Sequence, residues 1–437
     1  MKNLDMFGKT FECPCGRTHH IEPGQVIYGD DAAERLPAVC GALTGGRHAA
    51  VLMDVRTRAA AGGDVAGELS AAGWEVTQVV VPDLPDGRSP ICDDKTREAI
   101  EPRMASADVV VPVGSGVLSD LGKWIACDSG RPFACFATAA SMNGYASSNI
   151  SPTIRGVKSL LYARPPAAVL SSPAVLRDAP AEMTGSGLGD VLAKSVSSAD
   201  WYLNHLLFGD YYCRRSVALI EDVEPLYLEH PDRLARREDE AVAALFWGLL
   251  LTGVAMTMAE TSFPSSGGEH LTSHCLDMMS SVDGVPHDLH GRQVGVGTIL
   301  ASELYRRVLA IDSPRFVEPP AGVDSAFWGS LADSVAGEYA GKAERLAIAR
   351  EKLAEGDTWD RVRESLAAMV RPPEMIRDCL ARGGGAYLAE HIRCQRSRLL
   401  AAFTHAHEIR SRFTILDLAH LVGVMPAAAE EILQTWA

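Results

Sequence analysis

The chain has 437 residues, ten cysteines and a formal net charge of −15 at pH 7. A chain of this length is too long to fold around one hydrophobic core of ordinary size, so two or three domains are predicted. Binding to nucleic acid needs clustered Lys and Arg opposite the phosphates, so an acidic chain is expected to have no nucleic-acid partner. No signal peptide is expected at the N-terminus, and the cysteines are therefore predicted to be reduced thiols in the cytoplasm.

The first part of the chain alternates extended and helical patterns. Continuous apolar runs such as 47–54 and 108–113 are typical of buried parallel strands. Strands are expected at 25–29, 47–54, 74–81, 108–113, 132–138 and 167–171, and helices at 30–40, 65–72 and 94–104. This alternation predicts a doubly wound, Rossmann-like α/β domain over residues 1–180.

From residue 181 onward the apolar residues follow helical spacing, which predicts an all-helical domain over 181–437. Helices are expected at 191–207, 237–259, 270–279, 295–309, 332–355, 359–369 and 385–403. The longest apolar segment, 241–258, contains Trp247 and two glycines and is predicted to be a buried core helix, not a membrane span. The active site is expected in the cleft between the two domains.

A glycine-rich turn follows the strand at 108–113. Gly114, Ser115 and Gly116 lead directly into a helix, whose unpaired N–H groups and dipole favour an anion. A nucleotide pyrophosphate fits such a turn. Glycine turns after strands are common, however, and this one is not the GxGxxG fingerprint.

Two further features of the first domain can contact a nucleotide or its substrate. Asp54 follows a strand and can accept a bond from a ribose hydroxyl, which favours NAD over NADP; the alternative is a solvated strand end. The polar loop containing Thr138, Ser141 and Asn143 can line a ligand pocket.

Histidines indicate a metal site in the second domain. His270 and His274 stand at i,i+4, which places both rings on one helix face. His290 and Asp190, which lies among glycines, are candidate further ligands. In the alternative, His270 packs in a helix and Asp190 caps one. Two histidines and a carboxylate accept zinc, nickel or iron(II).

A second cluster lies near the N-terminus. Cys13 and Cys15 precede His19 and His20, and thiolates with imidazoles are zinc ligands. No matching pair nearby in the sequence completes four ligands. The role of these cysteines therefore stays open.

Several separated motifs together resemble the sn-glycerol-1-phosphate dehydrogenases. This family belongs to the superfamily of glycerol dehydrogenase, the iron-type alcohol dehydrogenases and dehydroquinate synthase. The motifs are Gly114–Gly116 with Asp120 and Lys123, the loop 138–145, Gly187–Asp190 with Lys194, Gly267–His270 with His274, and His290 with Gly291. The Cys13-Pro-Cys15-Gly segment with His19 is similar to the bacterial branch of the family.

The resemblance implies NAD or NADP, one divalent metal and the interconversion of dihydroxyacetone phosphate and sn-glycerol 1-phosphate. The substrate is a small phosphorylated ketone or polyol, and a homodimer or larger homo-oligomer is expected. The implied roles are metal ligation by Asp190, His270 and His290; cofactor contact by Asp54, Gly114, Ser115, Gly116, Asp120, Thr138 and Ser141; catalysis by His274 and Asn143; and substrate binding by Asn143, Lys194, His274 and Arg292.

The chain departs from the family pattern at several positions. Asn143 stands where relatives carry an aspartate, Ala140 replaces a proline, and Ser172 and Arg292 replace acidic residues. An amide keeps the shape of the carboxylate but takes up no proton. Two alternatives therefore stay open: a cyclising lyase of the dehydroquinate synthase type, and a nucleotide- or metal-binding homologue with altered or lost catalysis.

Overall fold

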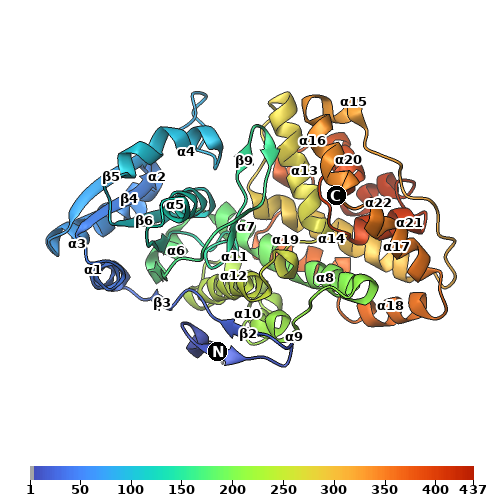
Figure 1. Ribbon diagram of the computed structural model, residues 1–437, viewed down its shortest axis with the longest axis horizontal. Helices are drawn as coiled ribbons and strands as arrows, with labels where there is room; N and C mark the ends of the chain where they lie inside the picture. Colours follow the sequence, from blue (N-terminus) through green and yellow to red (C-terminus); the bar gives the residue numbers. More distant parts are fainter. Residues whose placement is uncertain (1–3) are drawn as a thin grey trace. The chain divides into compact units, whose positions relative to one another are not determined.

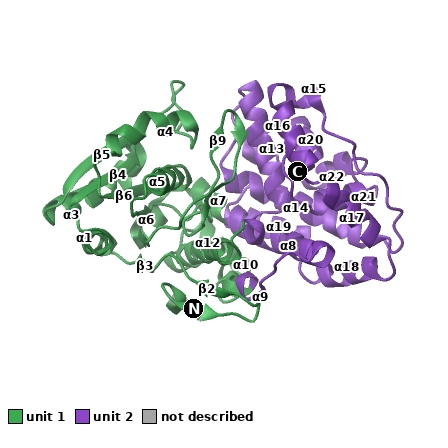
Figure 2. Ribbon diagram, in the orientation of Figure 1, with its two compact units in different colours: residues 1–187, 218–261 green, residues 188–217, 262–437 purple. Residues whose placement is uncertain are grey.

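The structure is a computed structural model that describes residues 4–437. The chain forms two compact units, which Figure 2 distinguishes by colour. Of the described residues, unit 1 comprises 4–187 and 218–261, and unit 2 comprises 188–217 and 262–437. The sequence placed a single boundary at residue 180. In the structure the segment 218–261, which was expected in the helical domain, belongs to unit 1.

The centre of unit 1 is a parallel sheet of six strands in the order β3-β12-β7-β6-β4-β5. Figure 1 labels β3, β4, β5 and β6 of this sheet. The strands are β3 (Gln25–Tyr28), β4 (His48–Asp54), β5 (Glu75–Val81), β6 (Val109–Gly114), β7 (Ala134–Ala137) and β12 (Ala168–Ser171). All six overlap the expected strands. The predicted parallel α/β architecture is thereby confirmed.

Helices cover both faces of this sheet. The helices of unit 1 are α1 (Ala32–Leu43), α2 (Val55–Thr57), α3 (Gly63–Ala71), α4 (Asp94–Ile100), α5 (Gly116–Asp128), α6 (Pro173–Asp178), α10 (Glu224–Leu228), α11 (Pro231–Ala235) and α12 (Asp239–Ala259). Side chains of β4 alternate between two cores: Val51 and Met53 pack with α1 and α3, and Ala50 and Leu52 pack with α4 and α5. Burial on both faces explains the continuous apolar run of this strand.

Helix α12 is the predicted core helix. It is long and apolar enough to cross a membrane, yet 89% of its most apolar window is buried inside the protein. Phe246 stacks on Tyr28 and meets the edge of Tyr145, both from unit 1. The apolar character of α12 therefore serves packing within unit 1.

Short antiparallel hairpins add to unit 1 and were not expected from the sequence. They pair β1 (Thr10–Glu12) with β2 (Thr18–His20), β8 (Asn149–Ile150) with β11 (Leu161–Tyr162), and β9 (Thr153–Ile154) with β10 (Val157–Lys158). Strands of two or three residues are too short to show an alternating pattern.

Unit 2 consists of helices and connecting segments in the part of the chain that the structure describes. Its helices are α8 (Lys194–Phe208), α9 (Arg214–Val217), α13 (Gly268–Asp283), α14 (His290–Leu309), α15 (Ser325–Trp328), α16 (Ala332–Ala340), α17 (Ala343–Leu353), α18 (Thr358–Ala367), α19 (Pro373–Gly383), α20 (Arg396–His405), α21 (Ile415–Leu421) and α22 (Ala429–Trp436). Helix α7 (Ala181–Leu192) spans the boundary at residue 187.

Two expected helices are partly wrong. The segment 332–355 was predicted to be one helix, but it forms α16 and α17, which a turn at 341–342 separates. The segment 385–403 was predicted to be helical throughout, but α20 begins only at Arg396. Gly384, with φ of 80°, ends α19, and a short 3-10 turn at Glu390–Ile392 follows. Arg393, with φ of 52°, ends this turn in a left-handed conformation, which the spacing of apolar residues does not reveal.

Candidate active site

Three side chains of unit 2 form a candidate metal centre. Asp190 lies in α7, His270 in the first turn of α13, and His290 is the first residue of α14. Their potential ligand atoms all lie within 4.8 Å of one another. His270 Nε2 is 3.3 Å from Asp190 Oδ1, and both side chains are almost fully buried. Three protein ligands with room for a further group are typical of catalytic zinc-type sites.

Glycines allow the three elements to approach closely. A Cβ on Gly189 would lie 2.0 Å from the carbonyl oxygen of Gly291, so α7 meets the first turn of α14 backbone to backbone. A Cβ on Gly297 would lie 2.5 Å from the carbonyl oxygen of Glu269, which brings α14 against α13 in the same way. No side chain fits at either contact. Gly189 and Gly297 therefore allow α7, α13 and α14 to pack closely enough for the three candidate ligands to meet.

Neighbouring side chains orient the two histidines. His270 Nδ1 lies 2.8 Å from Glu269 Oε1, and His290 Nδ1 lies 3.2 Å from Ser273 Oγ. Gln293 Nε2 donates to Ser273 Oγ at 3.0 Å and to Asp277 Oδ1 at 2.9 Å. Each imidazole thus has its Nδ1 engaged, which leaves Nε2 as the ligand atom. Such partners hold metal-binding histidines in one tautomer.

The electrostatics of the centre favour a positive charge. Burial lowers the pKa of His270, but hydrogen bonds with Asp190 and Glu269 outweigh it and raise the pKa to about 9. Asp200 also holds the start of α13. Burial and the negative charge of Glu269 raise the pKa of Asp200 to about 8. Asp200 accepts bonds from the backbone N–H of Gly268 at 2.8 Å and from Tyr305 at 2.5 Å.

The donor set fits a divalent metal. Two imidazole nitrogens and one carboxylate oxygen are a ligand set used for zinc, nickel and iron(II). The excess of buried acid at Asp190 and Glu269 would be balanced by a cation bound between the three ligands. Asp190, His270 and His290 would hold that metal, as the sequence predicts.

The remaining candidate residues of unit 2 surround the centre or brace its helices. The His274 ring stacks on His290 with centroids 5.5 Å apart, while His274 lies outside the group that could share one ion among residues 4–437. Lys194 is the buried first residue of α8. Arg292 donates to Asp288 Oδ1 at 2.9 Å and to the carbonyl oxygen of His391, so its guanidinium holds two segments together.

The glycine turn of unit 1 forms as predicted between β6 and α5. Gly114 ends the strand, where a Cβ would lie 2.4 Å from Leu118, and Gly116 begins the helix. The Thr138 N–H donates to the carbonyl oxygen of Gly114 at 3.3 Å, and the hydroxyls of Ser115 and Ser141 share a hydrogen bond. The turn after β6 and the loop after β7 therefore lie side by side.

Two buried residues brace these loops. Lys123 Nζ donates to the carbonyl oxygens of Gly144 at 2.8 Å and Ser147 at 3.0 Å. The hydroxyl of Tyr145 donates to the carbonyl oxygens of Ala139 and Gly114. These residues fix the backbone on both sides of Asn143. The sequence placed Lys123 and Tyr145 in motifs without assigning them this bracing role.

The loop that carries Asn143 also packs against α12. A Cβ on Gly253 would lie 2.6 Å from the carbonyl oxygen of Asn143. Asp120, the remaining residue of the motif, accepts from the Ser151 N–H at 3.2 Å. Both residues are therefore held in unit 1 by backbone contacts with neighbouring elements.

Asp54 stands at the carboxyl end of β4. Its Oδ1 accepts from the N–H groups of Arg56 at 2.9 Å and Thr57 at 2.7 Å, so it caps α2. From β4 the chain runs outward to β5, and β6 then pairs on the opposite side of β4. Ligands of open α/β sheets bind outside the carboxyl ends of strands at such a switch point. Asp54 and the Gly114 turn flank it.

The residues missed from the sequence are those that position the ligands. Glu269, Ser273 and Gln293 carry no motif of their own. A signal does exist, because Glu269 precedes one histidine, and Ser273 and Gln293 each stand three residues after a histidine. The pairing of Ser273 with His290 depends on the packing of α13 against α14, which the spacing alone does not specify.

The fold and the sequence match a known group of proteins. The family model described as iron-containing alcohol dehydrogenase matches residues 27–180. Glycerol-1-phosphate dehydrogenase of Geobacillus stearothermophilus is 30% identical over 415 residues, covering 93% of this chain and 94% of the relative. The Bacillus licheniformis protein of the same name is 28% identical over 420 residues, which cover 95% of this chain and 93% of the relative.

Solved structures agree at the level of the fold. A probable glycerol dehydrogenase from Sinorhizobium meliloti 1021 matches with a TM-score of 0.59 and 16% identity, covering 94% of this chain and 97% of the other. The fold is thus that of the iron-type alcohol and glycerol dehydrogenases. Near-complete coverage at 30% identity shows that the chain is a member of the glycerol-1-phosphate dehydrogenase family of metal- and NAD(P)-dependent oxidoreductases.

Proposed function

We propose that this protein interconverts dihydroxyacetone phosphate and sn-glycerol 1-phosphate, with NAD or NADP as hydride carrier. The observation that carries the proposal is the convergence of Asp190, His270 and His290, of which the first two are buried, in a member of this family. When bound, a divalent metal supplies Lewis-acid stabilisation of negative charge on the substrate oxygen. The residues around it bind, orient and protonate the substrate.

The nucleotide is assigned to the switch point of the sheet in unit 1. The N–H groups at Gly114, Ser115 and Gly116 open α5, and a helix N-terminus favours a pyrophosphate. Asp54 is positioned to accept from a ribose hydroxyl. Asp120, Thr138 and Ser141 complete the proposed cofactor site as supports of the turn and of the neighbouring loop.

His274 is the proposed proton donor to the substrate oxygen. Its ring lies against His290, one helical turn after His270, and is close to the metal ligands without belonging to their group. Asn143 keeps the hydrogen-bonding shape of an aspartate but cannot carry a proton. In this chain the imidazole of His274 is therefore the proposed donor of the proton, while Asn143 positions a substrate hydroxyl.

The phosphate of the substrate needs a cationic partner. Lys194 is buried at the start of α8, in the same unit as the metal centre, and is the proposed phosphate ligand. Arg292 is tied to Asp288 and to the His391 carbonyl oxygen. We assign to Arg292 a supporting charge beside the site.

The test follows the loss of NADH absorbance when purified protein is mixed with dihydroxyacetone phosphate. The protein is compared after metal removal and after reloading with zinc, nickel or iron(II). Turnover that depends on the metal and yields sn-glycerol 1-phosphate is expected. Absence of turnover with every metal, or phosphate release without net NADH oxidation, would overturn the proposal. The second result would instead favour a cyclising lyase.

We further propose that the protein acts in the cytoplasm as a homodimer or larger homo-oligomer. Its apolar helix α12 is used as core, and its ten cysteines form no disulfide among residues 4–437. Light scattering of the purified protein measures the assembly state. A monomeric mass at working concentration would exclude the oligomer.

A further inference from the structure

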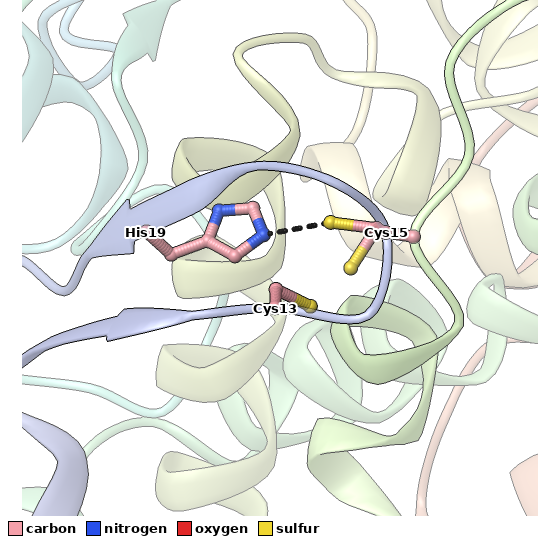
Figure 3. A group of neighbouring side chains, drawn as sticks. Cys13, Cys15 and His19 are labelled. Carbon is pink, nitrogen blue, oxygen red and sulfur yellow. Dashed lines mark hydrogen bonds between the residues drawn. The ribbon is translucent and has the colours of Figure 1, made fainter.

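The N-terminal hairpin of unit 1 gathers sulfur and nitrogen ligands that the proposed reaction does not use. Strands β1 and β2 pair antiparallel, with Phe11 opposite His19. The connecting turn contains Cys13 and Cys15. Figure 3 shows Cys13 where the chain leaves β1, Cys15 at the tip of the turn and His19 on β2.

Local sequence dictates the shape of this turn. The N–H of Gly16 donates to the carbonyl oxygen of Cys13 at 3.0 Å, and the N–H of Cys13 donates to the carbonyl oxygen of Arg17 at 3.0 Å. Pro14 occupies the second position of the turn, where its fixed φ is favoured, and Gly16 adopts a φ of 85°. This hairpin brings two cysteines, separated only by Pro14, onto one loop.

The side chains of the turn and of β2 converge. Cys15 Sγ lies 3.2 Å from His19 Nε2, the contact drawn as a dashed line in Figure 3. The potential ligand atoms of Cys13, Cys15 and His19 all lie within 4.8 Å of one another. Cys13 and His19 are buried, with 8% and 4% of their surface exposed. A single small ion can therefore touch all three.

The neighbouring histidine shows that this convergence is specific. Consecutive residues of a strand point to opposite faces, so His19 and His20 diverge. His20 Nδ1 instead meets Thr10 Oγ1 at 2.9 Å on the exposed side of the hairpin. Of these two histidines, it is His19 that lies with the sulfur atoms of Cys13 and Cys15.

We propose that Cys13, Cys15 and His19 bind a zinc ion that is separate from the active-site metal and stabilises the hairpin. Thiolate and imidazole ligands select zinc over oxygen-preferring cations such as magnesium. Structural zinc takes four ligands in tetrahedral geometry. The hairpin supplies three of them.

The purpose of such an ion is to hold a segment that is too small for its own core. The paired strands have three residues each, and a two-stranded hairpin is at best marginally stable in water. Metal ligation of both arms and the turn replaces the missing apolar burial. The ion also deprotonates the two thiols on binding.

The first test uses cobalt(II) as a spectroscopic substitute for zinc in the full-length chain. Thiolate ligands produce a sulfur-to-cobalt charge-transfer band, which a centre of two histidines and one aspartate does not produce. The wild-type protein is expected to show this band, and added zinc is expected to abolish it by displacing the cobalt. Its absence from cobalt-loaded wild-type protein would refute the hairpin site, whatever the outcome of the activity assay.

The second test separates the two metals by mutation. Cys13→Ser with Cys15→Ser is expected to lose about one equivalent of zinc per chain and the charge-transfer band, and to keep the active-site metal. His19→Ala should weaken the band, whereas His20→Ala, its matched control, should leave it unchanged. His270→Ala should lose the other metal and keep the band. Retention of full zinc content and of the band by the double cysteine variant would disprove the assignment.

A scan of the other cysteines identifies the fourth ligand. Each is replaced by serine in turn, and cobalt binding is measured. Cys127, which lies in unit 1 and bonds the backbone of Arg164, is a half-buried control thiol. Cys127→Ser is expected to keep the charge-transfer band at full intensity. Loss of the band in that variant would place the thiolate site away from the hairpin and contradict the proposal.

Discussion

At the residue scale, the candidate metal centre depends on glycines at positions where a larger side chain would clash with a neighbouring helix. Gly189 illustrates this, since an added Cβ would lie 2.0 Å from the carbonyl oxygen of Gly291. Gly189→Ala must push α7 away from α14 and so separate Asp190 from His290. We expect loss of most of the active-site metal, measured by elemental analysis. Gly337→Ala in α16, where a Cβ meets no atom within 4 Å, should keep the metal; equal metal content in both variants would contradict this account.

The carboxylate behind His270 offers a second prediction at this scale. Glu269 Oε1 engages His270 Nδ1 at 2.8 Å and accepts from the Gly267 N–H at 2.7 Å. Glu269→Gln removes the charge that favours the metal and disturbs the tautomer of the imidazole. Metal affinity should fall by about 10–100-fold, measured by chelator competition. Ser273→Ala removes the neutral partner of His290 and should reduce metal affinity less. A larger loss of affinity in Ser273→Ala than in Glu269→Gln would show that the charge of Glu269 does not favour the metal.

Asp54 is the residue proposed to set the preference for NAD over NADP. Its carboxylate caps α2, and the proposed ribose contact disfavours a 2′-phosphate. Asp54→Asn retains oxygen for the cap but loses the charge, so kcat/KM should shift from NAD toward NADP with unchanged stability. Asp54→Ala should shift the preference too and also lose about 1 kcal/mol of stability with the cap. An unchanged cofactor ratio in both variants would remove Asp54 from the nucleotide site.

At the scale of single elements, α21 couples stability to pH. His420 is buried with its ring 4.2 Å from His407, and burial, with the charges of Lys342 and His405, lowers the pKa of His420 from 6.5 to about 4. Between these values the unfolded chain binds a proton that the folded chain does not. Stability contributed by the neutral ring is therefore present above pH 6.5 and lost as the pH falls toward 4, by up to about 3 kcal/mol.

Urea unfolding at several pH values tests this coupling. The wild-type midpoint should fall more steeply between pH 6.5 and pH 4 than that of His420→Gln, which has no proton to gain. His230→Gln, at an exposed position, should follow the wild-type slope. Parallel slopes for all three proteins would show that acid destabilisation arises elsewhere.

At the scale of the whole molecule, the two units carry different proposed ligands. Removing metal should loosen the segments that hold it, because binding to the folded state alone stabilises it by mass action. Hydrogen exchange should rise after chelation in the first turns of α13 and α14 and in the hairpin 10–20. The core strands β4 and β6 should keep their protection. A uniform rise throughout both units would show that the metals act on global stability.

Predictions from the sequence succeeded where a local pattern decides the structure. The apolar runs at 47–54 and 108–113 became β4 and β6 because burial on both faces demands apolar residues at every position. The spacing of His270 and His274 correctly placed both on one helix. The pattern over 385–403 was wrong before Arg396, because Arg393 adopts a left-handed backbone conformation that apolar spacing does not encode.

The sequence by itself determined the parallel α/β architecture, the helical second half, and the membership of Asp190, His270 and His290 in one motif set. Tertiary structure alone decided that segment 218–261 belongs to unit 1, that Ser273 serves His290, and that Cys13, Cys15 and His19 converge. The physical reason is the separation along the sequence between the residues that interact. Burial periodicity and turn chemistry act between near neighbours, whereas these contacts depend on how closely separate elements pack.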